Sequence, residues 1–531
     1  MGSLLHELLS ETAAALPDKT AVLFNNSRIT YGELDKISNR LANLLMNMGV
    51  KPQDRIGIYM PRSIHSIISV FGILKAGAIY VPVDPFCPES RLQYIVNKCE
   101  IAILLASRDK LAKVSGTLSA DSPLQRVLIM DGLDEKLEVH PAIKLLWWER
   151  EQKGVNEAPQ QAKINDNELS YILFTSGSTG NPKGVMLSHR NALTFVNMAC
   201  KFFKIGDTDI FSNISPLHFD LSVFDLYVAF SAGAAVAIVP ESIAIFPSKL
   251  AEFIENYKIT VWNSVPSALA LLATFANLDT CDLSSLRLIL FAGEVFPVKY
   301  LRQLKRNIPD AQFYNIYGQT EANSSIYYLV DRIPDEDTSL IPIGKSFPDF
   351  DVFALDEKGR KITDQRTKGE LYVRSETIAS GYWQDPEQSG EKFVENPLSP
   401  GSGEIVYKTG DVVQMDSNGN YVFLGRVDHM IKSRGYRIEI GEIETILANH
   451  PQVKMAVVIP IPDELIGNRI AAIIVPADGS RLGKEEIVKH CSRLLPKYMV
   501  PEIVEFRDSL PMTSSGKADR KKLGLGMTHK S

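Results

Sequence analysis

The chain has 531 residues, which is too long for one compact core and predicts a large domain with smaller ones attached. Hydrophobic residues make up 45% and charged residues 23%, as in ordinary soluble globular proteins, and the formal net charge is -6. Without a basic excess, binding to nucleic acid or to a membrane surface is not expected. Five scattered cysteines without a CxxC pair favour neither disulfides nor a zinc site, so a reducing, cytoplasmic setting is expected.

Helices and strands are expected to alternate along the first two thirds of the chain. Apolar residues at helical spacing predict helices at 4–16, 31–48, 63–74 and 249–257. Short apolar runs predict strands at 55–59, 78–83, 101–105, 127–130, 236–239 and 286–291. No uninterrupted apolar stretch is long enough to span a bilayer. The alternation predicts an α/β fold with largely parallel sheets.

The pattern changes from about residue 352 onward. Short strands separated by turn residues predict a β-rich subdomain, with strands at 371–373 and 421–424. A small α+β domain is expected after it, with helices at 440–450 and 485–495 and a strand at 455–459. We therefore expect an N-terminal domain over 1–427 and a small, mobile C-terminal domain over 428–531.

The segment 171–191 carries the strongest chemical signal. An apolar run at 171–174 predicts a buried strand, and it leads into small residues whose N–H groups and hydroxyls can face an anion. The predicted phosphate-binding residues are Thr175, Ser176, Gly177, Ser178, Thr179, Gly180 and Lys183. Because Lys183 stands between Pro182 and Gly184, the loop lacks the GxxxxGK[ST] order, which disfavours a P-loop phosphoryl transferase.

This loop resembles the TSGSTGxPKG motif of the adenylate-forming enzymes, which include acyl-CoA synthetases, firefly luciferase and the adenylation domains of nonribosomal peptide synthetases. Four more motifs follow in that family's order: YGxTE at 317–321, YxTGD at 407–411, the hinge segment at 425–439 and PxTxxGKxxR at 511–520. One departure is Met430, where peptide synthetases usually carry Gln. The resemblance implies ATP and Mg²⁺ as cofactors.

The resemblance also implies roles for particular residues. Glu321 would hold Mg²⁺, Thr320 would bind a phosphate oxygen, and Lys517 would bridge the substrate carboxylate and the phosphate in the transition state. It also implies that Tyr317 stacks on adenine and that Asn315 lies at the adenine edge. Asp411 would accept hydrogen bonds from the ribose hydroxyls, and Arg426 would lie near the ribose and phosphate. Asp428 would be the hinge about which the C-terminal domain turns between two half-reactions, presenting the loop around Gly435 to a thiol-bearing arm.

The segment 218–225 resembles the FDxS segment of amino-acid adenylation domains. There the aspartate pairs with the substrate's α-ammonium group, and Asp220 holds this position, which disfavours fatty and aryl acids. Carried over one by one, the substrate-binding positions are Asp220, Leu221, Phe224, Asn263, Leu290, Ala292, Ile316, Ser324 and Ser325, with Lys517 completing the set. A pocket lined mostly by small or apolar groups implies a compact aliphatic amino acid.

The same positions are most similar to those of free-standing prolyl adenylation enzymes, which load a carrier protein. L-Proline is therefore the expected substrate, and a separate carrier protein with a phosphopantetheine arm the expected partner. D-alanine:carrier-protein ligases share the stretches at 219–223 and 293–295, so D-alanine, L-alanine and serine stay open, as does transfer to CoA. No carrier segment or HHxxxDG condensation motif is found, so a free-standing ligase is expected.

Overall fold

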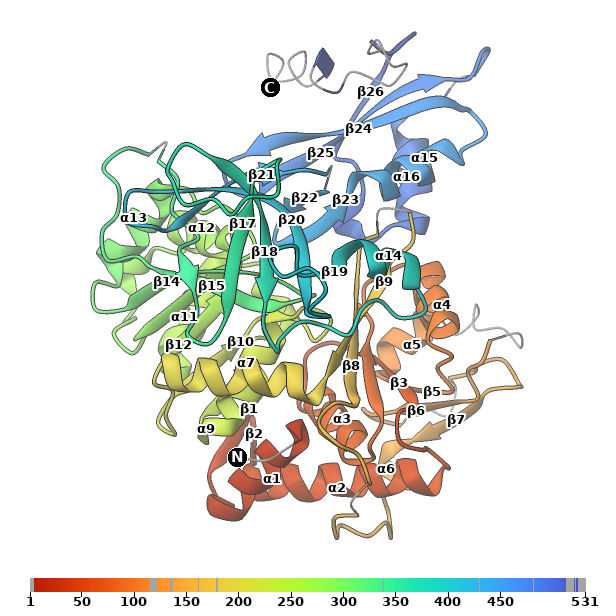
Figure 1. The fold of residues 1–531 in the computed structure, drawn as a ribbon. Helices are drawn as coiled ribbons and strands as arrows, with labels where there is room; N and C mark the ends of the chain where they lie inside the picture. Colours follow the sequence, from red (N-terminus) through yellow and green to blue (C-terminus); the bar gives the residue numbers. More distant parts are fainter. Residues whose placement is uncertain are drawn as a thin grey trace.

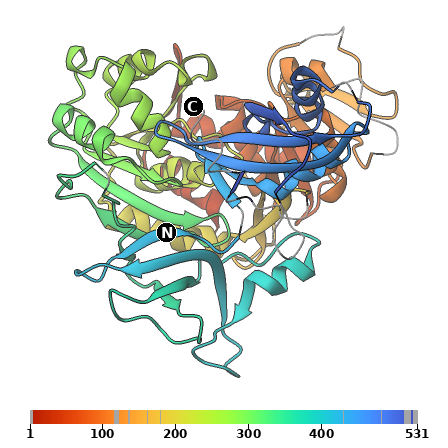
Figure 2. The same cartoon turned by 90° about the horizontal axis from the view of Figure 1, so that it is seen from above.

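The computed structural model describes residues 4–114, 122–133, 137–160, 162–177, 180–337, 339–428, 430–480, 482–511, 520 and 522–523. Within these residues the chain forms a large N-terminal part and a smaller C-terminal part that lies across one end of it (Figure 1). Seen from above, the C-terminal strands, drawn in blue, run across the region where the N-terminal subdomains meet (Figure 2).

A seven-stranded sheet forms one half of the N-terminal part. Its strands, in spatial order, are β7 (Lys144–Trp147), β6 (Arg126–Ile129), β5 (Ile103–Ala106), β3 (Arg55–Tyr59), β4 (Ile79–Pro82), β8 (Leu169–Thr175) and β9 (Lys183–Ser188). All neighbours are parallel except β8 and β9, which pair antiparallel with Thr175 opposite Lys183. This hairpin brings the two ends of the predicted phosphate loop together.

A nine-stranded sheet forms the other half. Its order is β16 (Lys345–Ser346), β15 (Asn323–Leu329), β14 (Gln312–Gln319), β13 (Leu288–Ala292), β12 (Val261–Ser264), β10 (Ile210–Asn213), β11 (Ala235–Ile238), β1 (Thr20–Phe24) and β2 (Ser27–Thr30). Strands β12, β13 and β14 are parallel, with Asn263 beside Leu290 and Ala292 beside Ile316. Because parallel strands end at one edge of a sheet, these side chains from distant segments gather there.

Helices lie between the two sheets and cover their outer faces. The layer between them contains α1 (Leu5–Ala15), α2 (Tyr31–Asn47), α3 (Ile64–Lys75), α7 (His189–Phe202), α8 (Leu221–Val223), the π-helix Phe224–Val228 and α9 (Ala229–Ala232). The outer helices are α4 (Glu89–Lys98), α5 (Arg108–Val114), α10 (Glu241–Ala244), α11 (Pro247–Tyr257), α12 (Pro266–Phe275) and α13 (Val298–Asn307). Short helices α6 (Trp148–Glu151) and α14 (Pro386–Lys392) and the 3-10 turn Leu278–Thr280 complete the N-terminal part.

The start of α2 shows how local sequence sets these elements. The hydroxyl of Thr30 accepts a hydrogen bond from the N–H of Glu33, and the carboxylate of Glu33 accepts one from the N–H of Thr30. This reciprocal pair satisfies two N–H groups that a helix start would otherwise leave unpaired. Apolar residues of α2 then face α3 in the layer between the sheets.

The rest of the chain forms a β-rich subdomain and a C-terminal α+β part. The subdomain consists of β17 (Asp351–Leu355), β18 (Lys368–Arg374), β19 (Phe393–Glu395), β20 (Ile405–Met415) and β21 (Tyr421–Arg426). The C-terminal part consists of β22 (Met430–Ser433), β23 (Tyr436–Glu439), α15 (Ile440–Ala448), β24 (Val453–Asp463), β25 (Gly467–Pro476), α16 (Lys484–Leu494), the 3-10 turn Lys497–Met499 and β26 (Ile503–Phe506). Asp428 lies in the link between β21 and β22.

The α/β architecture and the β-rich segment are confirmed. The motifs at 317–321 and 407–411 fall largely on strands, since Tyr317 lies within β14 and Asp411 within β20. The hairpin of β1 and β2 was not predicted. Among the described residues, none of the helices combines the length and the apolar character that a membrane span requires.

Candidate active site

A cavity lies at the edge where β8, β13 and β14 end, beneath the first residues of the C-terminal part. Eight of the nine predicted substrate-binding residues line it: Asp220, Leu221, Phe224, Asn263, Leu290, Ala292, Ile316 and Ser324. Ser325 is fully buried behind the wall, and its hydroxyl donates to the carbonyl groups of Ala322 and Asn323. Residues predicted to bind the nucleotide also reach the cavity, namely Thr175, Ser176, Thr320, Asp411 and Arg426.

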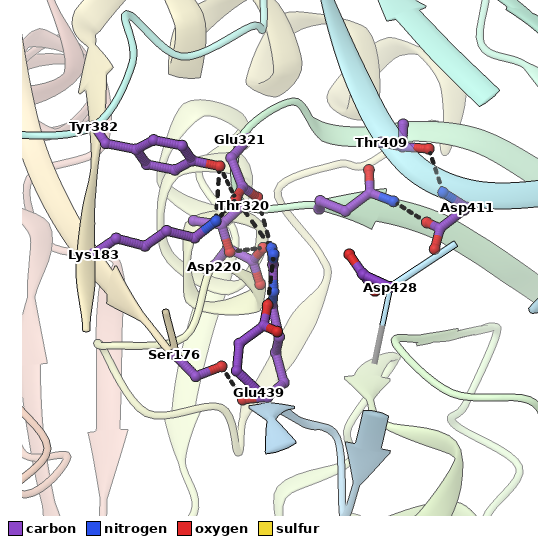
Figure 3. Close-up of polar contacts among 12 residues, drawn as sticks. Ser176, Lys183, Asp220, Thr320, Glu321, Tyr382, Thr409, Asp411, Asp428 and Glu439 are labelled. Atoms are coloured by element: carbon purple, nitrogen blue, oxygen red, sulfur yellow. Dashed lines mark hydrogen bonds and ion pairs between the residues drawn. The ribbon is translucent and has the colours of Figure 1, made fainter. Parts of the chain in front are cut away.

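Asp220 stands at the start of α8 and points toward Thr320, whose hydroxyl donates a hydrogen bond of 2.9 Å to Asp220 Oδ2 (Figure 3). Burial raises the pKa of Asp220, and the hydrogen bond from Thr320 and the charge of Lys432 oppose this rise. A carboxylate in such a poorly solvated wall is stabilised by a cation that enters the cavity. The position suits an ammonium group.

A second buried carboxylate lies behind the cavity wall. Asp225 accepts hydrogen bonds from the side-chain amides of Asn213 (3.2 Å) and Asn263 (3.1 Å). The nitrogen of Asn263 also donates to the carbonyl of Leu221, at 3.4 Å, and a carbonyl can only accept. The orientation of the Asn263 amide in the cavity wall is therefore fixed by two acceptors. Burial raises the pKa of Asp225 to about 7, and the two amides oppose the rise.

The predicted phosphate-binding residues surround the β8–β9 hairpin. The hydroxyl of Ser176 donates to the carbonyl of Arg437 at 2.8 Å, and Lys183 Nζ lies 2.9 Å from the hydroxyl of Tyr382. A Cβ on Gly177 would come within 2.0 Å of the Asn181 carbonyl oxygen, so this turn requires glycine. Ser178 and Thr179 lie outside the described residues.

Glu321 is fully buried and is surrounded by partners (Figure 3). It forms ion pairs with Arg437 at 3.0 Å and with Lys183 at 3.4 Å, and it accepts a hydrogen bond of 2.8 Å from Tyr382. Burial alone would raise the pKa of Glu321, but the charges of Arg437 and Lys183 hold the pKa well below its usual value. Burial lowers the pKa of Lys183 to about 8, helped by the charge of Arg437 and opposed by that of Glu321.

The second group of predicted nucleotide contacts centres on Asp411. The hydroxyl of Tyr317 and the side-chain amide of Gln319 each donate to Asp411 Oδ2 at 2.5 Å, and Arg426 forms an ion pair with Oδ1. Arg426 also pairs with Asp428 at 2.6 Å. These contacts hold the carboxylate of Asp411 at the cavity wall, where it can accept hydrogen bonds from the hydroxyl groups of a ribose.

The two predicted adenine contacts, Tyr317 and Asn315, do not line the cavity. Tyr317 is 8% exposed, with its hydroxyl on Asp411, and burial raises its pKa well above the usual value. Asn315 is 6% exposed and donates to the carbonyl of Pro342 at 2.8 Å. Their roles toward adenine therefore stay predictions.

Gln319, Tyr382 and Arg437 form hydrogen bonds with predicted site residues but were not assigned from the sequence. Lys432, which lines the cavity, was not assigned either. Gln319, Lys432 and Arg437 lie inside recognised motifs, and this position was the signal that could have identified them. Tyr382 lies between motifs and had no such signal. Lys517, by contrast, was assigned a role and lies outside the described residues.

The C-terminal part closes the cavity with residues 433–437, the tip of the β22–β23 hairpin, which is called the loop below. The N–H of Gly435 donates to Glu294 Oε1 at 2.6 Å, and the ring of Tyr436 packs edge-on against Phe219, with 5.3 Å between ring centres. Arg437 then reaches Glu321 and Ser176. These last two are the groups that the resemblance implies for Mg²⁺ and phosphate, and in the structure Arg437 occupies both of them.

Comparison with known proteins agrees with this architecture. Residues 9–383 match the AMP-binding enzyme family and residues 442–517 match the AMP-binding enzyme C-terminal domain. The chain therefore belongs to the AMP-binding enzyme family, as its motifs predicted.

Two relatives and one solved structure are similar over nearly the whole chain. An L-proline--[L-prolyl-carrier protein] ligase of Pseudomonas fluorescens is 36% identical, over 97% of this chain and 98% of its own length. A ligase of the same name from Streptomyces coelicolor is 35% identical, over 94% and 92%. The crystal structure of IdnL1 superimposes with a TM-score of 0.81 at 26% identity, covering 96% of this chain and 99% of IdnL1.

Proposed function

We propose that this ligase activates L-proline with ATP as prolyl-AMP and then transfers the prolyl group to the phosphopantetheine thiol of a separate carrier protein. The observation that carries the proposal is the cavity wall, where the carboxylate of Asp220 stands among side chains that are mostly small or apolar. The ammonium group of proline has two N–H donors that can form hydrogen bonds with the carboxylate of Asp220. Its compact ring can pack against the small and apolar side chains of the wall. The two full-length relatives named as prolyl ligases support the same assignment.

The first half-reaction joins the amino acid to AMP. A carboxylate oxygen of proline attacks the α-phosphorus of ATP, the bond to the β-phosphate breaks, and pyrophosphate leaves. This step requires no protein nucleophile, so the chain contributes by orientation and by neutralising charge. We assign the phosphates to Ser176, Lys183 and Thr320, the ribose to Asp411, and the transition-state charge to Lys517.

Glu321 is the group that fits a magnesium ion. The part of the chain that the structure describes contains no cluster of three or more metal-ligating side chains, and Mg²⁺ commonly binds through one or two carboxylates together with substrate phosphates. Glu321 can serve in this way once Arg437 leaves it. The ion would neutralise the phosphate oxygens, and Lys183 would share that task from the other side of the carboxylate.

The second half-reaction consumes the adenylate. The thiol attacks the acyl carbon, the bond to the AMP oxygen breaks, and the thiol proton passes to solvent or to AMP. Arg437 covers Glu321 in the structure, which suits this step because pyrophosphate and its metal have left. We assign residues 1–427 to the fixed domain, residues 428–531 to the moving one and Asp428 to the hinge.

The identity of the thiol is tested by product analysis. The enzyme is given ATP, Mg²⁺ and labelled L-proline, together with either CoA or a holo prolyl-carrier protein such as the one loaded by the Pseudomonas fluorescens relative. We expect label on the carrier protein and a much slower reaction with CoA. Prolyl-CoA as the faster product would contradict transfer to a carrier protein.

A further inference from the structure

Glu294, a carboxylate of the N-terminal part, forms a hydrogen bond with the loop that closes the cavity. Glu294 follows β13 and accepts two backbone hydrogen bonds, one from the N–H of Gly435 at 2.6 Å and one from the N–H of Ser267 at 3.0 Å. Ser267 belongs to the first turn of α12, whose N–H groups lack helical partners. One carboxylate oxygen of Glu294 thus binds the start of α12 at the rim of the cavity, and the other binds the C-terminal loop.

The loop residues next to this hydrogen bond pack closely against the N-terminal part and against the turn between β24 and β25. Gly435 has a φ of +79°, and a Cβ on it would come within 2.3 Å of the Val265 side chain. The N–H of Arg434 donates to the carbonyl of Ile466 at 3.0 Å, which links the loop to the turn between β24 and β25. A small displacement of the Gly435 peptide would therefore move Tyr436 and Arg437, the residues that enter the cavity.

In the structure, this contact coincides with coverage of the proposed phosphate site by Arg437. When Gly435 lies against Glu294, the next residues place Arg437 on Glu321 and on the hydroxyl of Ser176. The proposed sites of the phosphates and the metal use the same two groups. The hydrogen bond from Gly435 to Glu294 is therefore compatible with the step that follows the release of pyrophosphate, the attack of the thiol.

The loop also forms a wall of a second cavity. This cavity, of about 250 Å³, is lined by Val265, Arg434 and Tyr436 and shares His218 and Phe219 with the substrate cavity. The side chains of His218, Phe219 and Tyr436 thus form part of the wall of both cavities.

We propose that Glu294 is a positioning residue for the thiol-transfer step: it holds the Gly435 peptide at the cavity rim in the orientation that follows adenylation. The inference rests on the proposed function, because it requires a thiol that attacks an adenylate. Glu294 touches neither the nucleotide residues nor Asp220 through any contact that the described residues show. Its loss should therefore spare the first half-reaction.

The test separates the two half-reactions in Glu294→Gln. A glutamine keeps the size of the side chain but can offer an acceptor to only one of the two N–H groups, so its NH₂ group faces the other. Adenylation is measured by pyrophosphate exchange with L-proline. Thiol transfer is measured in a single turnover, in which preformed prolyl-AMP on the enzyme is mixed with D-pantetheine and the thioester is quantified.

We expect exchange within about twofold of the wild type and thioester formation slower by about tenfold or more, as for loss of a hydrogen bond to a charged group. Glu294→Asp retains the charge but is one methylene shorter, and it should give the same split if Glu294→Gln does not fold. Glu464→Gln is the matched control, because Glu464 lines the same gap between the two parts but is 74% exposed and pairs with Lys299. It should change neither rate.

An equal loss of both rates, or no loss of transfer in either Glu294 variant, would overturn this inference alone. A wild-type enzyme without amino-acid-dependent exchange would overturn the proposed function and the inference together. The two failures are therefore distinguishable from the same set of measurements.

Discussion

Asp220→Ala is expected to raise the KM of the amino acid about 100-fold in pyrophosphate exchange. Asp220 is the carboxylate in the wall of the substrate cavity, and its burial means that an ammonium group bound there gives up much of its water. Removing one partner of a poorly solvated charge pair costs about 3 kcal/mol, which is roughly two powers of ten in affinity. The KM of ATP should change little, because the nucleotide contacts are assigned to other residues.

Asp220→Asn separates the effect of the negative charge of Asp220 from the effect of the size and shape of its side chain. An asparagine oxygen can still accept the hydrogen bond from Thr320 but carries no charge, so the KM should rise nearly as far as in Asp220→Ala. Burial raises the pKa of Asp220, so in the wild type the carboxylate gains a proton as the pH falls and the KM of the amino acid rises. The asparagine variant should lack this component of the pH dependence. An unchanged KM in both variants would remove Asp220 from the ammonium site.

Glu321→Gln is expected to slow pyrophosphate exchange by roughly 100-fold or more, with a higher Mg²⁺ concentration needed for half-maximal rate. The amide can keep the hydrogen bond to Tyr382, but it cannot neutralise a metal ion and leaves the charges of Lys183 and Arg437 without their shared partner. Exchange rates over a range of Mg²⁺ concentrations, with a thermal melt to verify folding, measure both effects.

Glu439→Gln provides the comparison for this variant. Glu439 also pairs with Arg437, at 3.4 Å, and is 7% exposed, but within the described residues it forms no ion pair or hydrogen bond with Lys183. We expect its exchange rate and Mg²⁺ dependence to stay within a few-fold of the wild type. A Glu321→Gln enzyme with the same Mg²⁺ dependence as the wild type would contradict the metal-binding role.

Apolar spacing along the sequence predicted helices and strands that depend mainly on neighbouring residues. The apolar spacing at 31–48 indicated a helix, and the structure has α2 at Tyr31–Asn47, started by the Thr30 and Glu33 pair. The apolar run at 101–105 indicated a strand, found as β5. The hairpin of β1 and β2 was not predicted, since its first strand is completed by pairing with β11, far away in the sequence.

The residues of the candidate site could be predicted from the sequence, but some of the contacts between them could not. Motifs gave the identity of the residues, and the parallel order of β12, β13 and β14 explains why Asn263, Leu290 and Ile316 meet. Arg437 lies 116 positions from Glu321, and only the docking of the C-terminal part brings them together. Sequence patterns report which groups are present but not how the C-terminal part docks to pair them.

Pyrophosphate exchange across a panel of acids tests the central claim most directly. The wild-type enzyme is assayed with labelled pyrophosphate and ATP, and each proteinogenic amino acid, D-alanine and several fatty and aryl acids are supplied in turn. We predict a dominant signal with L-proline and weak signals with small amino acids such as L-alanine and serine. A dominant signal with D-alanine would contradict the prolyl assignment, and activity confined to acids without an amine would contradict the role of Asp220 itself.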